Sequence, residues 1–191
     1  TARLLHPNIL PVLSAGGDET LLYYLTPYVS AGSLRGHLPT HGPLPAAQAS
    51  TVASEVLAAL KFAHARGVVH RDIKPGNVLL SNGHALIAHF GIARALEAMH
   101  DLDDGRSSVA PPPAYRGPEN PAGEAADLSA VGALLFEMLT AHTPGPDVSA
   151  AAMSLALLEC NGSARPEALR ALALVIARAL CPGPGRGFAL G

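Results

Sequence analysis

Cysteine is scarce in this chain, because only Cys160 and Cys181 occur among its 191 residues. Their separation fits neither a metal-binding pattern nor a Cys-x-x-Cys pair, which argues against a disulfide framework. We therefore expect two reduced packing residues and a cytoplasmic protein.

An excess of charge of either sign is also missing. The formal net charge is -2 and the sequence pI is about 6.5, so the composition shows no excess of basic residues that would suit binding to nucleic acid or to an anionic membrane. No apolar run approaches the roughly 18 residues that a membrane span needs, and no signal peptide opens the sequence. With 49% apolar residues, one sizeable core can form. We expect a soluble protein with one main domain, no nucleic-acid partner and no membrane segment.

The segment 70–80, His-Arg-Asp-Ile-Lys-Pro-Gly-Asn-Val-Leu-Leu, places polar groups directly before an apolar run. Its Pro-Gly pair forces a loop, and the apolar residues can be buried behind that loop. Asp72, Lys74 and Asn77 are then presented from a rigidly backed turn. A carboxylate can accept a hydroxyl proton, a cation can hold a phosphate, and an amide oxygen can hold a hard metal ion. Together they indicate phosphoryl transfer.

His70-Arg71-Asp72, followed by four residues and Asn77, resembles the catalytic loop of protein kinases. Lys74, two residues after Asp72, is similar to the serine/threonine branch, and the chain resembles bacterial-type members of it. The resemblance implies transfer of the ATP γ-phosphoryl group to protein Ser or Thr, with Mg²⁺ and with a protein substrate or partner. It implies catalytic roles for Asp72 and Lys74 and a metal- and cofactor-binding role for Asn77.

Other segments extend this resemblance over nearly the whole chain. Thr26, Tyr28 and Val29 lie in a segment similar to the gatekeeper and hinge beside the adenine pocket. Two edge strands with core aromatics would fit Tyr23, Tyr24 and Tyr28 just as well. His89 stands where kinases carry the metal-binding Asp of Asp-Phe-Gly, 17 residues after Asp72. Segment 97–113 resembles an activation segment. The resemblance also implies structural roles for His70, Arg71, Phe90, Gly91, Glu119, Asp127 and Arg186.

The pattern of apolar, turn and capping residues predicts an α+β, mainly helical fold. We expect a hairpin around the turn at 14–18, a short helix from Ser33 through Leu38, and a longer helix that opens at Pro45 and is closed by Gly67. A short buried strand at 85–88 should follow the 81–83 turn, and Asp127 should cap a buried helix. Two more helices are predicted at 149–159 and 166–180. In kinase terms, 1–29 is a remnant of the small-lobe sheet and hinge, and 30–191 is a kinase-like large lobe.

Several parts of a kinase active site do not occur in these residues. No Gly-x-Gly-x-x-Gly is present, and the two lysines, Lys61 and Lys74, lie on a predicted helix and in the catalytic loop. A strand lysine and the helix glutamate that pairs with it are therefore missing. His89 removes an oxygen ligand that Mg²⁺ prefers. We expect weak binding of ATP and Mg²⁺ and an inactive or strongly impaired enzyme.

Three alternatives remain open. The chain could be a pseudokinase that acts as a protein-binding or scaffold module. His84 and His89 could bind zinc, although no further ligand at a suitable spacing supports this. A helical interaction domain with a coincidental loop would also be compatible with the composition, but it would not explain the ordered series of motifs.

Overall fold

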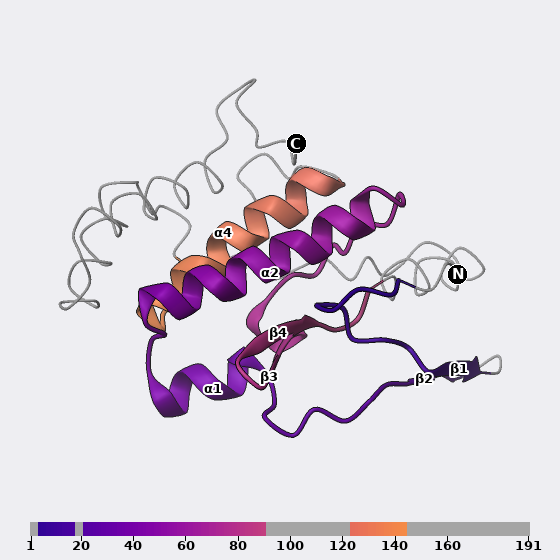
Figure 1. Ribbon diagram of the computed structural model, residues 1–191, viewed down its shortest axis with the longest axis horizontal. Helices are drawn as coiled ribbons and strands as arrows, with labels where there is room; N and C mark the ends of the chain where they lie inside the picture. Colours follow the sequence, from indigo (N-terminus) through magenta and orange to yellow (C-terminus); the bar gives the residue numbers. More distant parts are fainter. Residues whose placement is uncertain (1–3, 18–20, 91–122, 145–191) are drawn as a thin grey trace.

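The computed structural model describes residues 4–17, 21–90 and 123–144, and it contains helices and two short sheets (Figure 1). In chain order its elements are β1 (Ser14–Gly17), β2 (Leu22–Leu25), α1 (Leu34–His41), α2 (Ala46–His64), the 3-10 turn η1 (Pro75–Asn77), β3 (Val78–Ser81), β4 (His84–Ile87) and α4 (Glu124–Thr140). The predicted helices at 149–159 and 166–180 lie outside the described residues.

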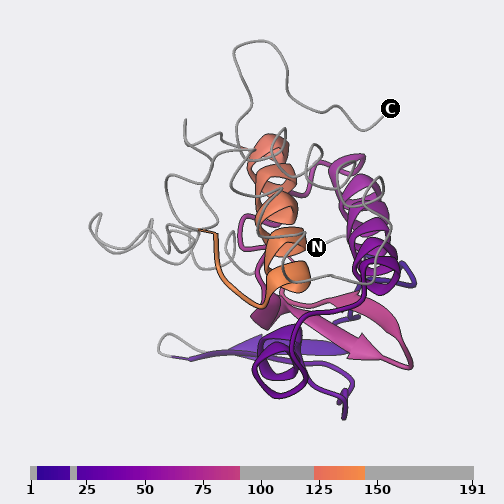
Figure 2. The same cartoon turned by 90° about the vertical axis from the view of Figure 1, so that its left-hand side faces the viewer.

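The helices α2 and α4 pack side by side, and α2 packs against strand β4 of the β3–β4 hairpin (Figures 1 and 2). Proline before α2 has a φ of -54°, which suits the entry to a helix. Apolar residues then recur at helical spacing and are buried, as predicted: Val52, Val56, Leu60 and Ala63. Helix α4 is buried along most of its length. The prediction of a mainly helical fold around a buried central helix is confirmed.

The β3–β4 hairpin forms as predicted, with its register running from Val78 opposite Ile87 to Ser81 opposite His84. Asn82 and Gly83 have φ values of 51° and 84°, which a tight two-residue turn requires and which Asn and Gly tolerate. The N-terminal segment extends this sheet, because Ile87 exchanges backbone hydrogen bonds of 2.8 Å with Asn8 and Leu10.

The prediction for the first hairpin was wrong in its strands. Residues 14–17, predicted as a turn, form β1 and pair with β2 from Ser14 opposite Leu25 to Gly17 opposite Leu22. Small residues are needed there, because a Cβ at Gly16 would lie 2.6 Å from the Tyr23 hydroxyl oxygen. The apolar run at 9–10 is not a strand of this hairpin, since it bonds to β4 instead.

Two helix boundaries also differ from the prediction. Helix α1 continues past Pro39 to His41, and it ends where the Gly42 amide donates to the Leu38 carbonyl at 2.9 Å. The Ser33 side chain makes no capping hydrogen bond. Helix α4 begins at Glu124, so Asp127 lies inside its first turn and does not cap it. No described helix has the length and apolar character needed to cross a membrane.

Candidate active site

The catalytic-loop residues are held between buried neighbours. Pro75 opens the single turn of η1, and the Asn77 amide donates to the Lys74 carbonyl at 2.9 Å. Ile73 and Val78, on either side of the turn, are 1% and 0% exposed. Helix α1 packs against η1 on another side. The sequence prediction of a loop with a rigid apolar backing therefore describes this segment correctly.

Three predicted site residues lie together on this loop. The Lys74 Nζ atom is 2.9 Å from Oδ1 and 2.6 Å from Oδ2 of Asp72. The Asn77 amide nitrogen donates to Oδ2 of Asp72 at 2.8 Å and to its backbone carbonyl at 2.7 Å. The carboxylate and the ammonium remain accessible, with side chains 30% and 29% exposed. Because a carboxylate has about four lone-pair sites, Asp72 keeps capacity for a further donor such as a substrate hydroxyl.

Asp127 anchors the start of the loop from helix α4. Its Oδ2 accepts from the His70 amide at 2.8 Å, and its Oδ1 accepts from the Arg71 amide at 2.7 Å. Asp127 is only 1% exposed, so these bonds form in a medium that strengthens them. They stabilise a left-handed backbone at Arg71, whose φ is 68°. Helix α4 thus fixes the direction in which the chain enters the loop.

His64 is a further part of this anchor that the sequence analysis missed. Its Nε2 donates to Oδ2 of Asp127 at 2.8 Å, while its Nδ1 lies 3.9 Å from the exposed Glu124. The helical spacing of α2 could have indicated that His64 is buried, because this polar residue continues the buried apolar face of the helix one turn after Leu60. A buried polar side chain on such a face requires a partner.

His70 is held by both of its ring nitrogens. Its Nε2 donates to the Ala88 carbonyl at 2.9 Å, and its Nδ1 accepts from the Asp72 amide at 3.2 Å. Burial lowers the pKa of His70, although the hydrogen bond to Ala88 and the charges of Asp127 and Asp72 oppose this. The ring also meets the Phe90 ring edge to face at a centroid distance of 4.6 Å. The neutral ring therefore connects the catalytic loop to the segment that carries His89.

His89 lies near the catalytic loop, since the charges of Asp72 and Lys74 act on its ring. Its φ is 73°, a left-handed value that His and Asp tolerate better than most side chains. Its ring faces Tyr24 of β2 at a centroid distance of 6.0 Å. Burial lowers the pKa of His89, the charge of Asp72 raises it, and the charge of Lys74 lowers it. A neutral imidazole is the favoured state.

These donors do not suit Mg²⁺. Hard oxygen ligands are required in near-octahedral geometry, but position 89 carries an imidazole, which leaves the amide oxygen of Asn77 as the ligand of this kind on the catalytic loop. The carboxylate of Asp72 is already paired with Lys74. Zinc at His84 and His89 is not supported either, because His84 pairs with Glu55 at 2.6 Å and no group of three potential metal ligands occurs among the described residues.

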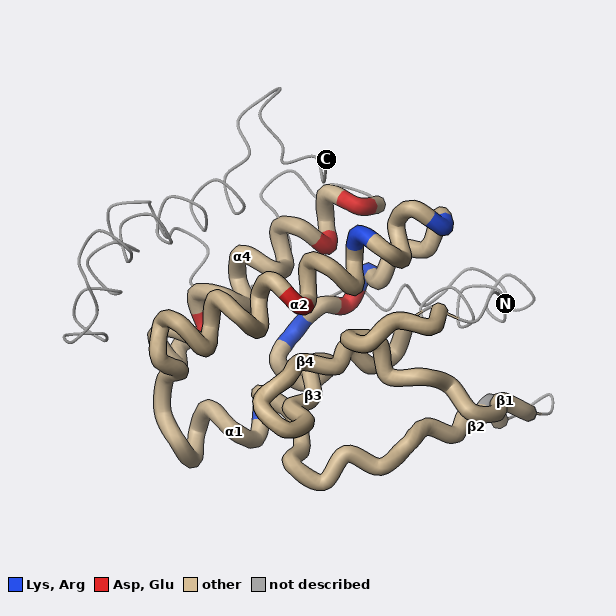
Figure 3. The backbone as a smooth tube through the Cα atoms, viewed as in Figure 1, with Lys and Arg blue, Asp and Glu red and all other residues tan. Residues whose placement is uncertain are grey.

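The nucleotide-side residues form a more open region. Tyr28 is 90% exposed, while Thr26 and Val29 are half-buried. Charged residues are concentrated on α2, α4 and the neighbouring loop, whereas the strands β1 and β2 carry none (Figure 3).

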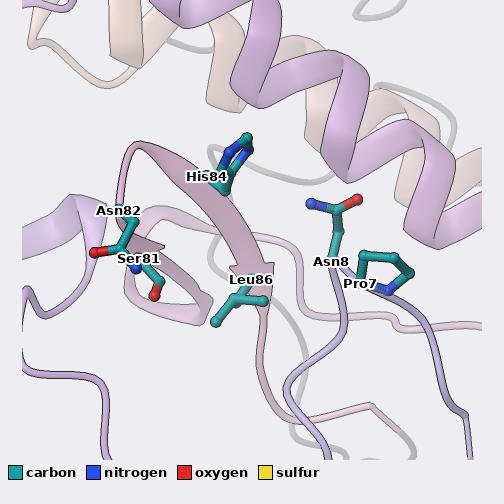
Figure 4. A pocket seen from close by; sticks show the side chains of 6 residues that line it. All are labelled: Pro7, Asn8, Ser81, Asn82, His84 and Leu86. Carbon is teal, nitrogen blue, oxygen red and sulfur yellow. The ribbon is translucent and has the colours of Figure 1, made fainter.

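A cavity of about 360 Å³ lies away from the catalytic loop, around the β3–β4 turn (Figure 4). It is lined by Pro7, Asn8, Ser81, Asn82, His84 and Leu86.

Several predicted positions lie outside the described residues. They are Gly91, the 97–113 segment, Glu119 and Arg186, together with both cysteines. Their roles remain predictions.

Comparisons with known proteins indicate the family. A profile described as "Protein kinase domain" matches residues 1–165. The chain is 35% identical over 161 residues to a probable serine/threonine-protein kinase PknB of Lactococcus lactis, covering 81% of this chain and 25% of that protein. It is 33% identical over 196 residues to the serine/threonine-protein kinase PknB of Mycobacterium tuberculosis, covering 96% of this chain and 31% of that protein. The chain thus spans less than a third of the length of these relatives.

A solved structure also indicates a protein kinase domain. The crystal structure of a mutant form of the PknI kinase domain of Mycobacterium tuberculosis is similar, with a TM-score of 0.70 and 27% identity. The match covers 97% of this chain and 67% of that one. The catalytic loop, the fold and these relatives together show that the chain belongs to the protein kinase family, as a serine/threonine kinase domain of the bacterial type.

Proposed function

We propose that this chain is the large lobe of a serine/threonine protein kinase that keeps the half of the site facing the protein substrate and has lost the principal carboxylate of the half that binds metal. The observation that carries this proposal is the contrast between two groups of residues. Asp72, Lys74 and Asn77 form a closely bonded set on the catalytic loop, whereas His89 replaces the metal-binding carboxylate. The proposed reaction is transfer of the ATP γ-phosphoryl group to a protein hydroxyl, strongly impaired in this chain.

The retained half has suitable chemistry. Asp72 is the base that would accept the proton of a Ser or Thr hydroxyl, and the Asn77 amide holds its carboxylate in position. Lys74 provides a positive charge beside the point where phosphate oxygens would arrive. Both side chains are reachable from solvent, as a protein substrate requires.

The metal-binding half of the site, which is impaired, determines the rate of phosphoryl transfer. A single preorganised group can stabilise a transition state by roughly 3–4 kcal/mol. Without the carboxylate at position 89, and with no strand lysine among these 191 residues, the rate would then be about five powers of ten lower. Asp72 and Asn77 cannot compensate, because phosphoryl transfer depends mainly on positioning and charge.

The test separates these two losses. We would measure radiolabelled phosphate transfer to a generic basic protein by four proteins: this chain, its His89→Asp variant, this chain with a complete kinase small lobe fused before Thr1, and the fusion with His89→Asp. Only the last should be robustly active. In that protein, Asp72→Asn should abolish transfer, while substitution of the exposed His142 should not.

Two results would contradict the proposal. Robust transfer that depends on Asp72 in the unfused chain, with or without His89→Asp, would mean that the missing parts are not needed. A well-folded fusion with His89→Asp that shows no transfer would mean that the retained half is not a working phosphoacceptor site.

A second candidate function is supported by the apolar surface of the first hairpin. Leu13, Tyr23 and Leu25 are 60%, 52% and 56% exposed. Exposed apolar side chains on a short sheet suit a protein-binding surface. As a pseudokinase, the chain would act in cytoplasmic signalling by binding a partner through this surface, and Tyr23→Ser with Leu25→Ser would abolish binding without affecting the catalytic loop.

A further inference from the structure

The two faces of strand β2 differ in their exposure to solvent. Tyr23 and Leu25, on one face, are 52% and 56% exposed, whereas Tyr24, which points to the other face, is half-buried. Burial also raises the pKa of the Tyr24 hydroxyl group. A sheet of only two strands cannot cover its own faces, so part of the cover of Tyr24 comes from outside the β1–β2 hairpin.

The ring of His89 supplies part of this cover. The centroids of the Tyr24 and His89 rings are 6.0 Å apart and the ring planes meet at 79°, which is the edge-to-face arrangement that aromatic pairs prefer. The hairpin projects away from helices α2 and α4 (Figures 1 and 2). The ring pair therefore links this projecting hairpin to the segment that follows strand β4.

His89 is also close to the catalytic loop, because the charges of Asp72 and Lys74 act on its ring. Its backbone is left-handed, with a φ of 73°, and the backbone conformation limits the rotamers that a side chain can adopt. Within the residues that the structure describes, the His89 ring has no hydrogen bond and no ion pair. The orientation of the imidazole thus depends on packing, and Tyr24 is its aromatic partner.

We infer that Tyr24 is a positioning residue for the side chain at position 89, and that its ring holds the imidazole between the hairpin and the catalytic loop. The contact acts in both directions, because the same pair of rings docks a two-stranded sheet that is marginally stable alone. At the position where kinases carry a metal-binding carboxylate, this chain would then have an anchor for the hairpin. The inference does not rest on the proposed phosphoryl transfer, since the ring contact can be measured without nucleotide or substrate.

The first test compares the intact chain with its Tyr24→Phe and Tyr24→Leu variants. Both substitutions remove the hydroxyl group, but only Tyr24→Leu removes the ring. Diethyl pyrocarbonate modifies accessible neutral imidazoles, and mass spectrometry of the peptides gives a separate rate for each histidine. His89 should react about two- to tenfold faster in Tyr24→Leu, as expected for the loss of one aromatic pair, and at an unchanged rate in Tyr24→Phe. The exposed His142 should react equally in all three proteins.

The second test uses the reciprocal variant, His89→Asn, which removes the imidazole but tolerates a left-handed backbone. Hydrogen exchange of the β2 amides should accelerate about two- to tenfold in Tyr24→Leu and in His89→Asn. The double variant should exchange no faster than the single variants, because both substitutions break the same contact. Unchanged exchange in β3 and β4 would show that the rest of the fold is intact.

Three results would overturn the inference. One is additive acceleration in the double variant, which would mean that the two side chains act independently. Another is an equal rate of His89 modification in Tyr24→Phe and Tyr24→Leu, which would mean that the hydroxyl group matters and the ring does not. The third is the absence of any change in either test, which would mean that the rings do not hold each other.

Discussion

At the scale of single residues, Asp127 is the group on which the geometry of the catalytic loop most depends. It accepts hydrogen bonds from the His64 ring and from the amides of His70 and Arg71, and it is almost fully buried. Asp127 acts on Asp72 only through the backbone of the loop, so it is a positioning residue. A buried acceptor with three donors is costly to alter, because each donor left without a partner keeps its full desolvation penalty.

We predict that Asp127→Asn lowers the free energy of unfolding by about 2–4 kcal/mol, since an amide cannot accept with both terminal atoms and the bonds lose their charge. Urea unfolding followed by circular dichroism measures this. Glu124→Gln is the matched control on the same helix, because Glu124 is 61% exposed and lies 3.9 Å from His64. It should change stability by less than about 0.5 kcal/mol. Similar effects of the two substitutions would show that Asp127 does not anchor the loop.

At the scale of elements, Glu55 joins helix α2 to the β3–β4 hairpin. One carboxylate oxygen accepts from Nδ1 of His84 at 2.6 Å, and the other accepts from the Ala85 amide at 2.7 Å. His84 is largely exposed, with 70% of its side chain accessible, whereas Ala85 is buried. The hydrogen bond from the Ala85 amide to Glu55 therefore contributes most of the stability of this connection.

We predict that Glu55→Ala destabilises the chain by about 1–3 kcal/mol, because it leaves a buried backbone donor without a partner. His84→Ala, which removes only the exposed partner, should cost less than about 0.5 kcal/mol. Unfolding in urea compares the two variants, and amide hydrogen exchange at Ala85 should accelerate only in Glu55→Ala. If the two variants were equally destabilised, the exposed ion pair would be the stronger link.

The elements also show what the sequence could and could not predict. Helix α2 and the β3–β4 hairpin were predicted well, because helical spacing of apolar residues and an Asn-Gly turn are local signals. Strand β1 was not, because its small residues are required by contact with Tyr23, which lies on another strand. Asp127 and His64 were misjudged or missed for the same reason: their partners are 56 to 63 residues away in the chain. The catalytic loop was predictable since Asp72, Lys74 and Asn77 are close in sequence.

At the scale of the whole molecule, the described residues divide into a well-buried part and an open one. The buried part contains α2, α4, β3 and β4 and supports the catalytic loop. The open part is the β1–β2 hairpin with its flanking segments, where large apolar side chains are exposed. These are Leu5, Val12, Leu13, Leu21, Tyr23, Leu25 and Tyr28. An isolated two-stranded sheet is marginally stable, so this part gives a nucleotide little rigid structure to bind.

We predict that this chain binds ATP with a dissociation constant above about 1 mM, which corresponds to less than roughly 4 kcal/mol of standard binding free energy. The adenine would meet only the hinge side, where Tyr28 is 90% exposed, and no glycine-rich loop or strand lysine within these residues would hold the phosphates. Mg²⁺ should add little, because His89 is a poor ligand for it. Calorimetric titration with and without Mg²⁺ measures both, with His142→Ala as a matched control for nonspecific effects. Micromolar affinity that requires Mg²⁺ would contradict the prediction, since it would need a metal site that Asn77 and His89 cannot provide.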